Sequence, residues 1–287
     1  MRESRTAGSS RPGWLVDAHA HLHPGFDLAR SLGAAAANFR RATLALGAAA
    51  SSRACMFLVE AEGTAPFRRL SSDSLPGGWR QARTAEPASL LLVHDDHPPM
   101  VVVRGRQLRT AEGLEVLAVG VPDQGGNELR DRRPIADTVR RAAGAAAVVI
   151  LPWGFGKWRG RRARLMRATL RGSLPPRVFV GDTGNRPRLL PYPVLLREAR
   201  AGGMWVLPGS DPLPLGSHAG RLGTCGAFLE CEPDLENPLH QIVGLLSIRT
   251  TQPDMFCRPE PAPRFAVAQF LMQLPPGLRN RFAGGAA

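Results

Sequence analysis

Two histidines at a spacing of two follow a short apolar run near the N-terminus. The run is WLV at 14–16, and the next five residues read DAHAH. Side chains two apart in a β-strand share a face, so we expect Asp17, His19 and His21 to project together. Imidazole is the commonest metal-binding side chain. The pattern predicts half of a metal site in which Asp17 orients an imidazole. The alternative is a polar loop whose histidines hydrogen-bond to the main chain.

Other polar side chains follow later apolar runs. They are Glu62 after 55–59, Lys157 after 148–151, Asp182, Asn185 and Arg186 after 178–180, and Asp211 after 205–207. Parallel α/β barrels build their active sites at the carboxyl ends of the strands, so we expect these groups to share one rim.

Each of these positions also has a structural explanation. Glu115 lies within an apolar run, where a buried carboxylate is costly unless it is paired or coordinated; the alternative is a strand face in solvent. Asp211 precedes a proline and also suits a helix N-cap. Asp182 opens a good turn sequence. Lys157 either binds an anionic substrate group or is a solvated loop residue.

The pattern of apolar runs and helical stretches predicts the fold. We expect strands at 14–17, 55–59, 90–93, 100–103, 114–119, 148–151, 178–180, 205–207 and 228–229. We expect helices at 26–50, 135–143, 161–170, 194–201, 239–247 and 264–274, and an irregular segment at 64–87. Such alternation favours an α/β fold, a (β/α)7 TIM-like barrel with a β-hairpin excursion at 90–103 and C-terminal helices.

The 287-residue length fits one barrel domain, which we place at 14–287 behind a disordered leader at 1–13. No apolar run approaches the roughly 18–20 residues of a membrane span, and the N-terminus lacks a secretory signal. We therefore expect a cytoplasmic protein without a membrane partner. The four cysteines, Cys55, Cys225, Cys231 and Cys257, show no C-x2-C spacing, and we expect free, mostly buried thiols.

The chain is strongly basic, with 37 Lys and Arg against 24 Asp and Glu and a net charge of +13. Such a charge attracts anionic substrates or nucleic acid. The basic residues are scattered, however, and the aromatic content of 6% offers few base-stacking groups. Nucleic acid is thus a possible but not a favoured partner, and a small anionic substrate is preferred. The sequence does not specify the oligomeric state.

Three segments resemble the PHP family of metal-dependent phosphoesterases and, more distantly, the amidohydrolase superfamily. They are the DAHAH segment at 17–21, GLEVL at 113–117 and GSD at 209–211. The resemblance implies a metal site formed by His19, His21, Glu115 and Asp211, with Asp182 or Asn185 as a further group. It departs from the family where Pro152-Trp153 replaces an expected histidine and where Asp211 precedes Pro212 in place of D-x-H.

We therefore predict a metal-dependent hydrolase, favouring phosphoesters, that uses metal-activated water. One or two divalent ions (Zn, Mn or Fe) would be held by His19, His21, Glu115, Asp182 and Asp211. In this hypothesis Asp211 moves the proton, while Lys157 and Arg186 neutralise substrate oxygens. Two alternatives remain: a degenerate barrel that binds a ligand or a protein without catalysis, and a basic nucleic-acid-associated protein.

Overall fold

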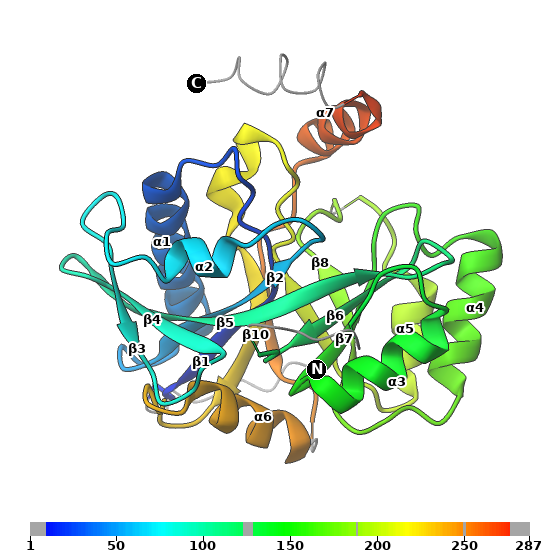
Figure 1. Ribbon diagram of the computed structural model, residues 1–287, viewed down its shortest axis with the longest axis horizontal. Coiled ribbons are helices and arrows are strands. Elements are labelled where there is room, and N and C mark those ends of the chain that lie inside the picture. Colours follow the sequence, from blue (N-terminus) through cyan, green and yellow to red (C-terminus); the bar gives the residue numbers. More distant parts are fainter. Residues whose placement is uncertain (1–9, 123–128, 188, 249–250, 276–287) are drawn as a thin grey trace, which may run out of the picture.

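The computed structural model describes residues 10–122, 129–187, 189–248 and 251–275. Its main sheet is nearly closed and barrel-like, with helices on the outside (Figure 1). The strands follow the order β11-β10-β1-β2-β5-β6-β7-β8-β9, and β4 pairs with β5 and with β3 off this path. The predicted mixed α/β barrel-like architecture is confirmed at this level.

The first half of the sheet contains strands from 13 to 119. They are β1 (Gly13–Ala20), β2 (Arg53–Glu60), β3 (Arg80–Arg83), β4 (Ser89–His94), β5 (His97–Arg109) and β6 (Glu115–Val119). The helices here are α1 (Leu28–Leu46) and α2 (Pro66–Leu70). Helix α1 begins where Asp27 caps the amide of Arg30 and ends at Gly47, whose φ of 63° is left-handed.

The second half alternates strands and helices. Its strands are β7 (Val148–Pro152), β8 (Val178–Thr183), β9 (Val206–Gly209), β10 (Cys225–Glu230) and β11 (Asp254–Cys257). Its helices are α3 (Ile135–Ala145), α4 (Gly160–Arg171), α5 (Val194–Ala201), the 3-10 helix η1 (Gly216–Arg221), α6 (Pro238–Ile248) and α7 (Ala262–Gln273). The predicted C-terminal helices correspond to α6 and α7.

The direction of β6 departs from the predicted (β/α)7 pattern. Strands β1, β2, β5, β7, β8 and β9 run parallel, whereas β6 pairs antiparallel with both β5 and β7. Only residues 110–114 join β5 to β6, closed by a hydrogen bond from Thr110 N to the Leu114 carbonyl. A parallel crossover needs a dozen or more residues, so this link forces a hairpin.

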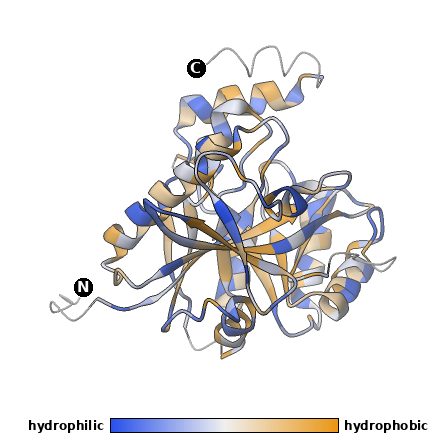
Figure 2. Ribbon diagram, turned by 60° about the vertical axis from the view of Figure 1, so that its left-hand side comes forward, coloured by the Kyte–Doolittle hydropathy of each residue, from blue (hydrophilic) through white to orange (hydrophobic). Residues whose placement is uncertain are grey.

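Apolar side chains alternate between the inside of the barrel and its outer layers. Trp14, Val103, Leu117 and Phe179 belong to the interior cluster, which α6 closes at one end. A second cluster lies under α1, and a third lies between the sheet and α3, α4 and α5. The strands are mostly apolar in Figure 2, as expected for strands covered on both faces. Among the described residues, no helix is both long and apolar enough to cross a bilayer.

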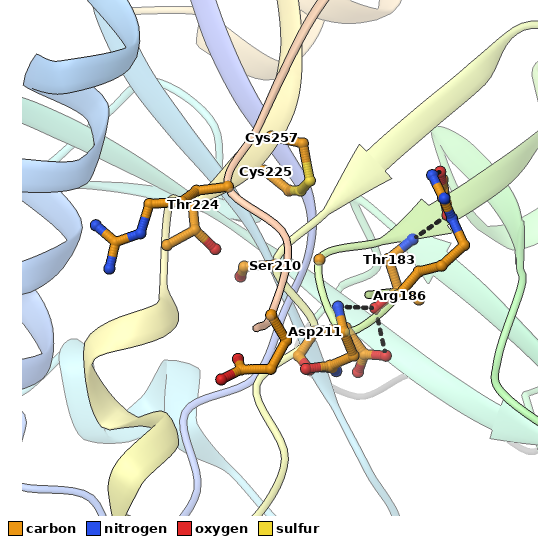
Figure 3. The surroundings of a disulfide bond; sticks show 12 residues. Thr183, Arg186, Ser210, Asp211, Thr224, Cys225 and Cys257 are labelled. Carbon is orange, nitrogen blue, oxygen red and sulfur yellow. Dashed lines mark hydrogen bonds and ion pairs between the residues drawn. A yellow bond between two sulfur atoms is a disulfide. The ribbon is translucent and has the colours of Figure 1, made fainter. Parts of the chain in front are cut away.

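Two expectations at the chain level need correction. The cysteines at 225 and 257 are not free thiols, because they face each other on antiparallel β10 and β11 and form a disulfide (Figure 3). Cys55 and Cys231 are free, as predicted. The leader predicted at 1–13 is also too long: Gly13 starts β1, and Arg11 forms ion pairs with Glu230 and Asp254. Residues 1–9 lie outside the described residues.

Candidate metal centre

His19, His21 and Asp211 form the one group of potential metal ligands found in the described part of the chain. The Nε2 atoms of the two imidazoles lie 3.0 Å apart. The Asp211 Oδ1 atom lies 3.6 Å from Nε2 of His19 and 3.8 Å from Nε2 of His21. Both histidines are buried. The predicted meeting of the first histidine pair with the late aspartate is thus present in the geometry.

A β-bulge in β1 aims the two imidazoles into the barrel. The pairing with β2 shifts between Asp17 and Ala20, where two residues of β1, Ala18 and His19, oppose Phe57 alone. Before the shift, Val16 and Ala18 belong to the interior cluster, whereas Ala20 belongs to the outer cluster under α1. The alternation therefore reverses within the bulge, as bulges commonly do next to functional sites.

The hydrogen bond between His21 and Val59 fixes the tautomer of this imidazole. His21 Nδ1 lies 2.9 Å from the Val59 carbonyl oxygen, which only accepts, so Nδ1 carries the proton. Burial lowers the pKa of His21 to about 3, with the neighbouring His19 acting in the same direction, so the ring is neutral. Its Nε2 lone pair therefore points into the cluster.

Gln107 adds an oxygen to this group and was not singled out from the sequence. Its Oε1 atom lies 3.1 Å from His21 Nε2 and 3.3 Å from His19 Nε2. A signal existed: Val101 and Val103 belong to the interior cluster, and period-two alternation along β5 places Gln107 on the same face. A neutral His21 nitrogen, an amide oxygen and a carboxylate oxygen all accept, so their convergence favours a shared cation.

Glu115, which was predicted as a metal ligand, lies beside this cluster and is not one of the three grouped residues. Antiparallel β6 starts opposite Arg109, the last residue of β5, so its first residue reaches the carboxyl ends of the parallel strands. Glu115 Oε1 accepts from Gln107 Nε2 at 3.4 Å and pairs closely with the ammonium of Lys157. Glu115 and Lys157 are therefore ion-paired with each other.

The backbone of Asp211 is held in an unusual conformation. Its φ of 44° is uncommon for a residue other than glycine. Its amide donates to the His19 carbonyl at 2.8 Å, and Thr183 Oγ1 donates to its Oδ2 at 3.1 Å. Burial acts to raise the pKa of Asp211, but His19, His21, Lys157 and the Thr183 bond outweigh it and hold the pKa below its usual value. A stored backbone strain of this kind is typical of functional sites.

Asp17 does not orient an imidazole, contrary to our expectation. Its carboxylate accepts from the amides of His19, Ser210 and Gly223 at 3.3, 2.8 and 2.9 Å, and from the Ser210 hydroxyl at 2.5 Å. Burial raises its pKa to about 6 even though these bonds favour the ionised form. The side chain ties β1 to the segments that carry Ser210 and Gly223.

Asp182 and Arg186 form an ion pair with each other and do not contact the cluster. Two hydrogen bonds of 3.1 and 2.7 Å join the guanidinium to the carboxylate. Along β8, Val178 and Val180 belong to the outer cluster, so Asp182 follows the outward alternation. The inward position is taken by Thr183, which contacts Asp211. A shift of one residue along a strand thus separates a predicted ligand from the centre.

Asn185 and Glu62 complete the predicted set. Asn185 is buried, and its side-chain amide donates to the main-chain carbonyl of Asp211. Its Oδ1 atom is buried without a partner in the described residues. Glu62 is exposed in the turn after β2. The neighbouring Glu60 is buried and pairs with Arg104 at 3.2 Å.

A cavity of about 380 Å³ lies beyond the loop that carries Lys157. Its lining residues are mostly apolar and aromatic, and include Trp153, Phe155, Trp158, Tyr192 and Arg159. These come from the loop after β7 and the segment before α5. Figure 3 places Thr183, Ser210 and Asp211 in the surroundings of the disulfide that joins β10 and β11.

The fold is a nearly closed α/β barrel with polar groups at the carboxyl ends of its strands. No family model matches the sequence, and neither does any curated protein. The structure is similar to the crystal structure of PsfC from Pseudomonas syringae PB-5123, with a TM-score of 0.53 and 14% sequence identity. The similarity covers 95% of this chain and 99% of that chain. At this identity it shows a shared fold.

Proposed function

We propose that this protein is a metal-dependent hydrolase that acts on a small anionic substrate, with a phosphoester favoured. The observation that carries the proposal is the convergence of His19 Nε2, His21 Nε2, Gln107 Oε1 and Asp211 Oδ1 in one group, in which the histidines are buried and the other two residues are partly buried. The hydrogen bond to the Val59 carbonyl leaves His21 Nε2 without a proton, so this nitrogen cannot donate to the neighbouring oxygens of Gln107 and Asp211. The mixed nitrogen and oxygen set suits Zn, Fe or Mn.

Each residue has a defined task in this proposal. His19, His21, Gln107 and Asp211 would hold the cation, which when bound lowers the pKa of a water molecule and so supplies a nucleophile at neutral pH. Asp211 is ionised because its pKa lies below its usual value, and its carboxylate would accept a proton from the water molecule. Lys157 neutralises charge that develops on the substrate oxygens. Arg186 drops out of the predicted catalytic set because its partner Asp182 follows the outward alternation of β8, away from the cluster.

The resemblance to PHP proteins enters as support for this proposal. The H-x-H and G-S-D segments supply three of the four proposed ligands. The positive charge of +13 supports an anionic substrate.

Metal analysis combined with phosphoesterase assays tests the proposal. We expect purified protein to retain a divalent metal after gel filtration and to hydrolyse p-nitrophenyl phosphate or its bis ester with added Zn or Mn. The His19→Ala/His21→Ala variant should lose the metal and reduce kcat/KM at least about 100-fold. The matched control, His94→Ala/His97→Ala, changes two histidines of the β4–β5 hairpin and should retain both. A metal-free protein that is equally stable after the first double change would favour the non-catalytic barrel.

A further inference from the structure

Lys157 is the one lysine in the chain, and every other basic side chain is arginine. Its ammonium is paired closely with Glu115, whose carboxylate also accepts from Gln107 Nε2. The other end of the same amide, Oε1, faces the imidazoles. Gln107 therefore divides the site into two compartments, one formed by His19, His21 and Asp211 and one formed by Glu115 and Lys157.

The charges in these two compartments differ. The first contains one carboxylate and two imidazoles, of which His21 carries its proton on the nitrogen that faces the Val59 carbonyl. In the second, the carboxylate of Glu115 is already neutralised by a cation. Two divalent ions at the usual separation of about 3.5–4 Å repel each other strongly and need several carboxylates between and around them. The third carboxylate expected from the sequence, Asp182, is instead paired with Arg186.

We propose that the Lys157 ammonium takes the place of a second metal ion, so that the centre binds a single divalent cation. This inference rests on the proposed function. An ammonium is a compact point charge of nearly ionic size. Together the bound cation and Lys157 would present two positive charges to one anionic substrate group.

The loop geometry keeps the ammonium in position. Lys157 N donates to the Gly154 carbonyl at 3.0 Å, which closes a turn after β7. A Cβ atom at Gly154 would lie 2.8 Å from Lys157 Cδ, so the aliphatic stem lies against this glycine. The turn thus directs the only lysine toward Glu115 across β6.

Titration of metal-free full-length protein with ZnCl2 and with MnCl2, followed by calorimetry and by elemental analysis, tests the inference. We expect the wild type to bind one ion per chain. Lys157→Met frees Glu115 and should raise the stoichiometry to two. Lys157→Met/Glu115→Gln should return it to one. Lys157→Arg keeps the charge and is the matched control, with one ion expected. Circular dichroism checks that each variant is folded.

The outcomes separate this inference from the proposed function. Two ions bound to the wild type would overturn the inference and leave the hydrolase proposal standing. One ion in both the wild type and folded Lys157→Met would also overturn it, because Lys157 would not be what excludes the second ion. No ion bound to the wild type would defeat both proposals.

Discussion

Asp17 is a buried carboxylate whose hydrogen bonds all go to main-chain amides and to the Ser210 hydroxyl. The sequence marked it as important because it lies in the D-x-H-x-H pattern, but the role follows from the bulge that turns it away from His19 and His21. Its effect on the centre is indirect, since it fixes the main chain on both sides of the cluster.

Asp17→Asn should lower the free energy of unfolding by about 2–3 kcal/mol, because an amide nitrogen would replace an oxygen that accepts from buried donors. Urea denaturation followed by tryptophan fluorescence measures the change. Asp27→Asn is the matched control: this exposed carboxylate caps α1, and asparagine caps a helix about equally well. Equal stability of Asp17→Asn and wild type would contradict the proposal that the Asp17 carboxylate fixes the main chain around the cluster.

His218 is buried like His19 and His21, and the amide of Leu213 donates to its Nδ1 at 3.2 Å. Burial lowers its pKa to about 4; Arg221 and His23 act in the same direction, and Asp211 opposes them. A histidine with a lowered pKa stabilises the fold fully above the unfolded value of 6.5, and this stability is lost as the pH falls toward 4.

His218→Gln should therefore flatten the pH dependence of stability. Between pH 6.5 and 4 the wild type should lose up to about 3 kcal/mol more than the variant, since glutamine can accept the same amide without titrating. Urea midpoints at pH 4, 5, 6 and 7 provide the measurement. His240→Gln, at an exposed histidine, should follow the wild-type curve. A His218→Gln curve parallel to the wild type would refute the assignment.

At the scale of elements, the contact between β1 and β9 closes the barrel without a hydrogen-bonded ladder between the two strands. Gly209 makes this approach possible: a Cβ atom there would lie 2.3 Å from His19 N and 2.4 Å from His19 Cβ. The same close contact lets the Asp211 amide reach the His19 carbonyl. The glycine of the G-S-D segment is thus required by packing.

Gly209→Ala should destabilise the protein by about 3 kcal/mol, because the methyl group forces β1 and β9 apart. The variant should also weaken metal binding, since His19 and Asp211 lie on the two separated strands. Gly33→Ala is the control: this glycine lies within α1 with no atom near its Cβ position, so alanine should stabilise by roughly 0.5–1 kcal/mol. Equal effects of the two changes would count against the packing argument.

Local patterns predicted most elements well. Helix α5 spans 194–201 as expected, and β2, β7 and β8 extend the predicted apolar runs by a few residues. The segment predicted as irregular at 64–87 contains α2 and β3, both short and without a strong apolar period. Strand β11 was also missed, because three of its four residues are exposed and its pairing with β10 is long-range.

The candidate site was predicted in part. The pattern located His19, His21 and Asp211, since each follows an apolar strand. It misassigned the direction of Asp182, because one-residue register decides which face a side chain occupies. The bulge in β1 was missed, since a bulge depends on how two strands pair and not on the sequence of one. Gln107 was missed although period-two alternation along β5 places it on the inner face. The disulfide was missed because cysteine spacing alone does not specify pairing.

For the whole molecule, the proposed metal centre lies at the rim of the barrel, and its residues come together only in the folded state. A cation that binds the native state and not the unfolded chain raises stability by mass action. With free Zn or Mn at 100 times the dissociation constant, the free energy of unfolding should rise by about 2.7 kcal/mol. Chemical denaturation with metal and with a chelator measures the difference.

The His19→Ala/His21→Ala variant is the control for this linkage. Its unfolding midpoint should be the same with metal and with the chelator, whereas His94→Ala/His97→Ala should keep the wild-type response. Stabilisation of the His19→Ala/His21→Ala variant by metal would locate the cation elsewhere.

The carboxylate of Asp17 accepts hydrogen bonds from Ser210 and Gly223, which lie about two hundred residues later in the chain. During synthesis these partners leave the ribosome long after β1 does. His19 and His21 therefore emerge before the segments that would complete the proposed centre. A nascent chain shorter than roughly 225 residues should therefore acquire no metal. Binding of the proposed cation would occur late, after most of the polypeptide has emerged.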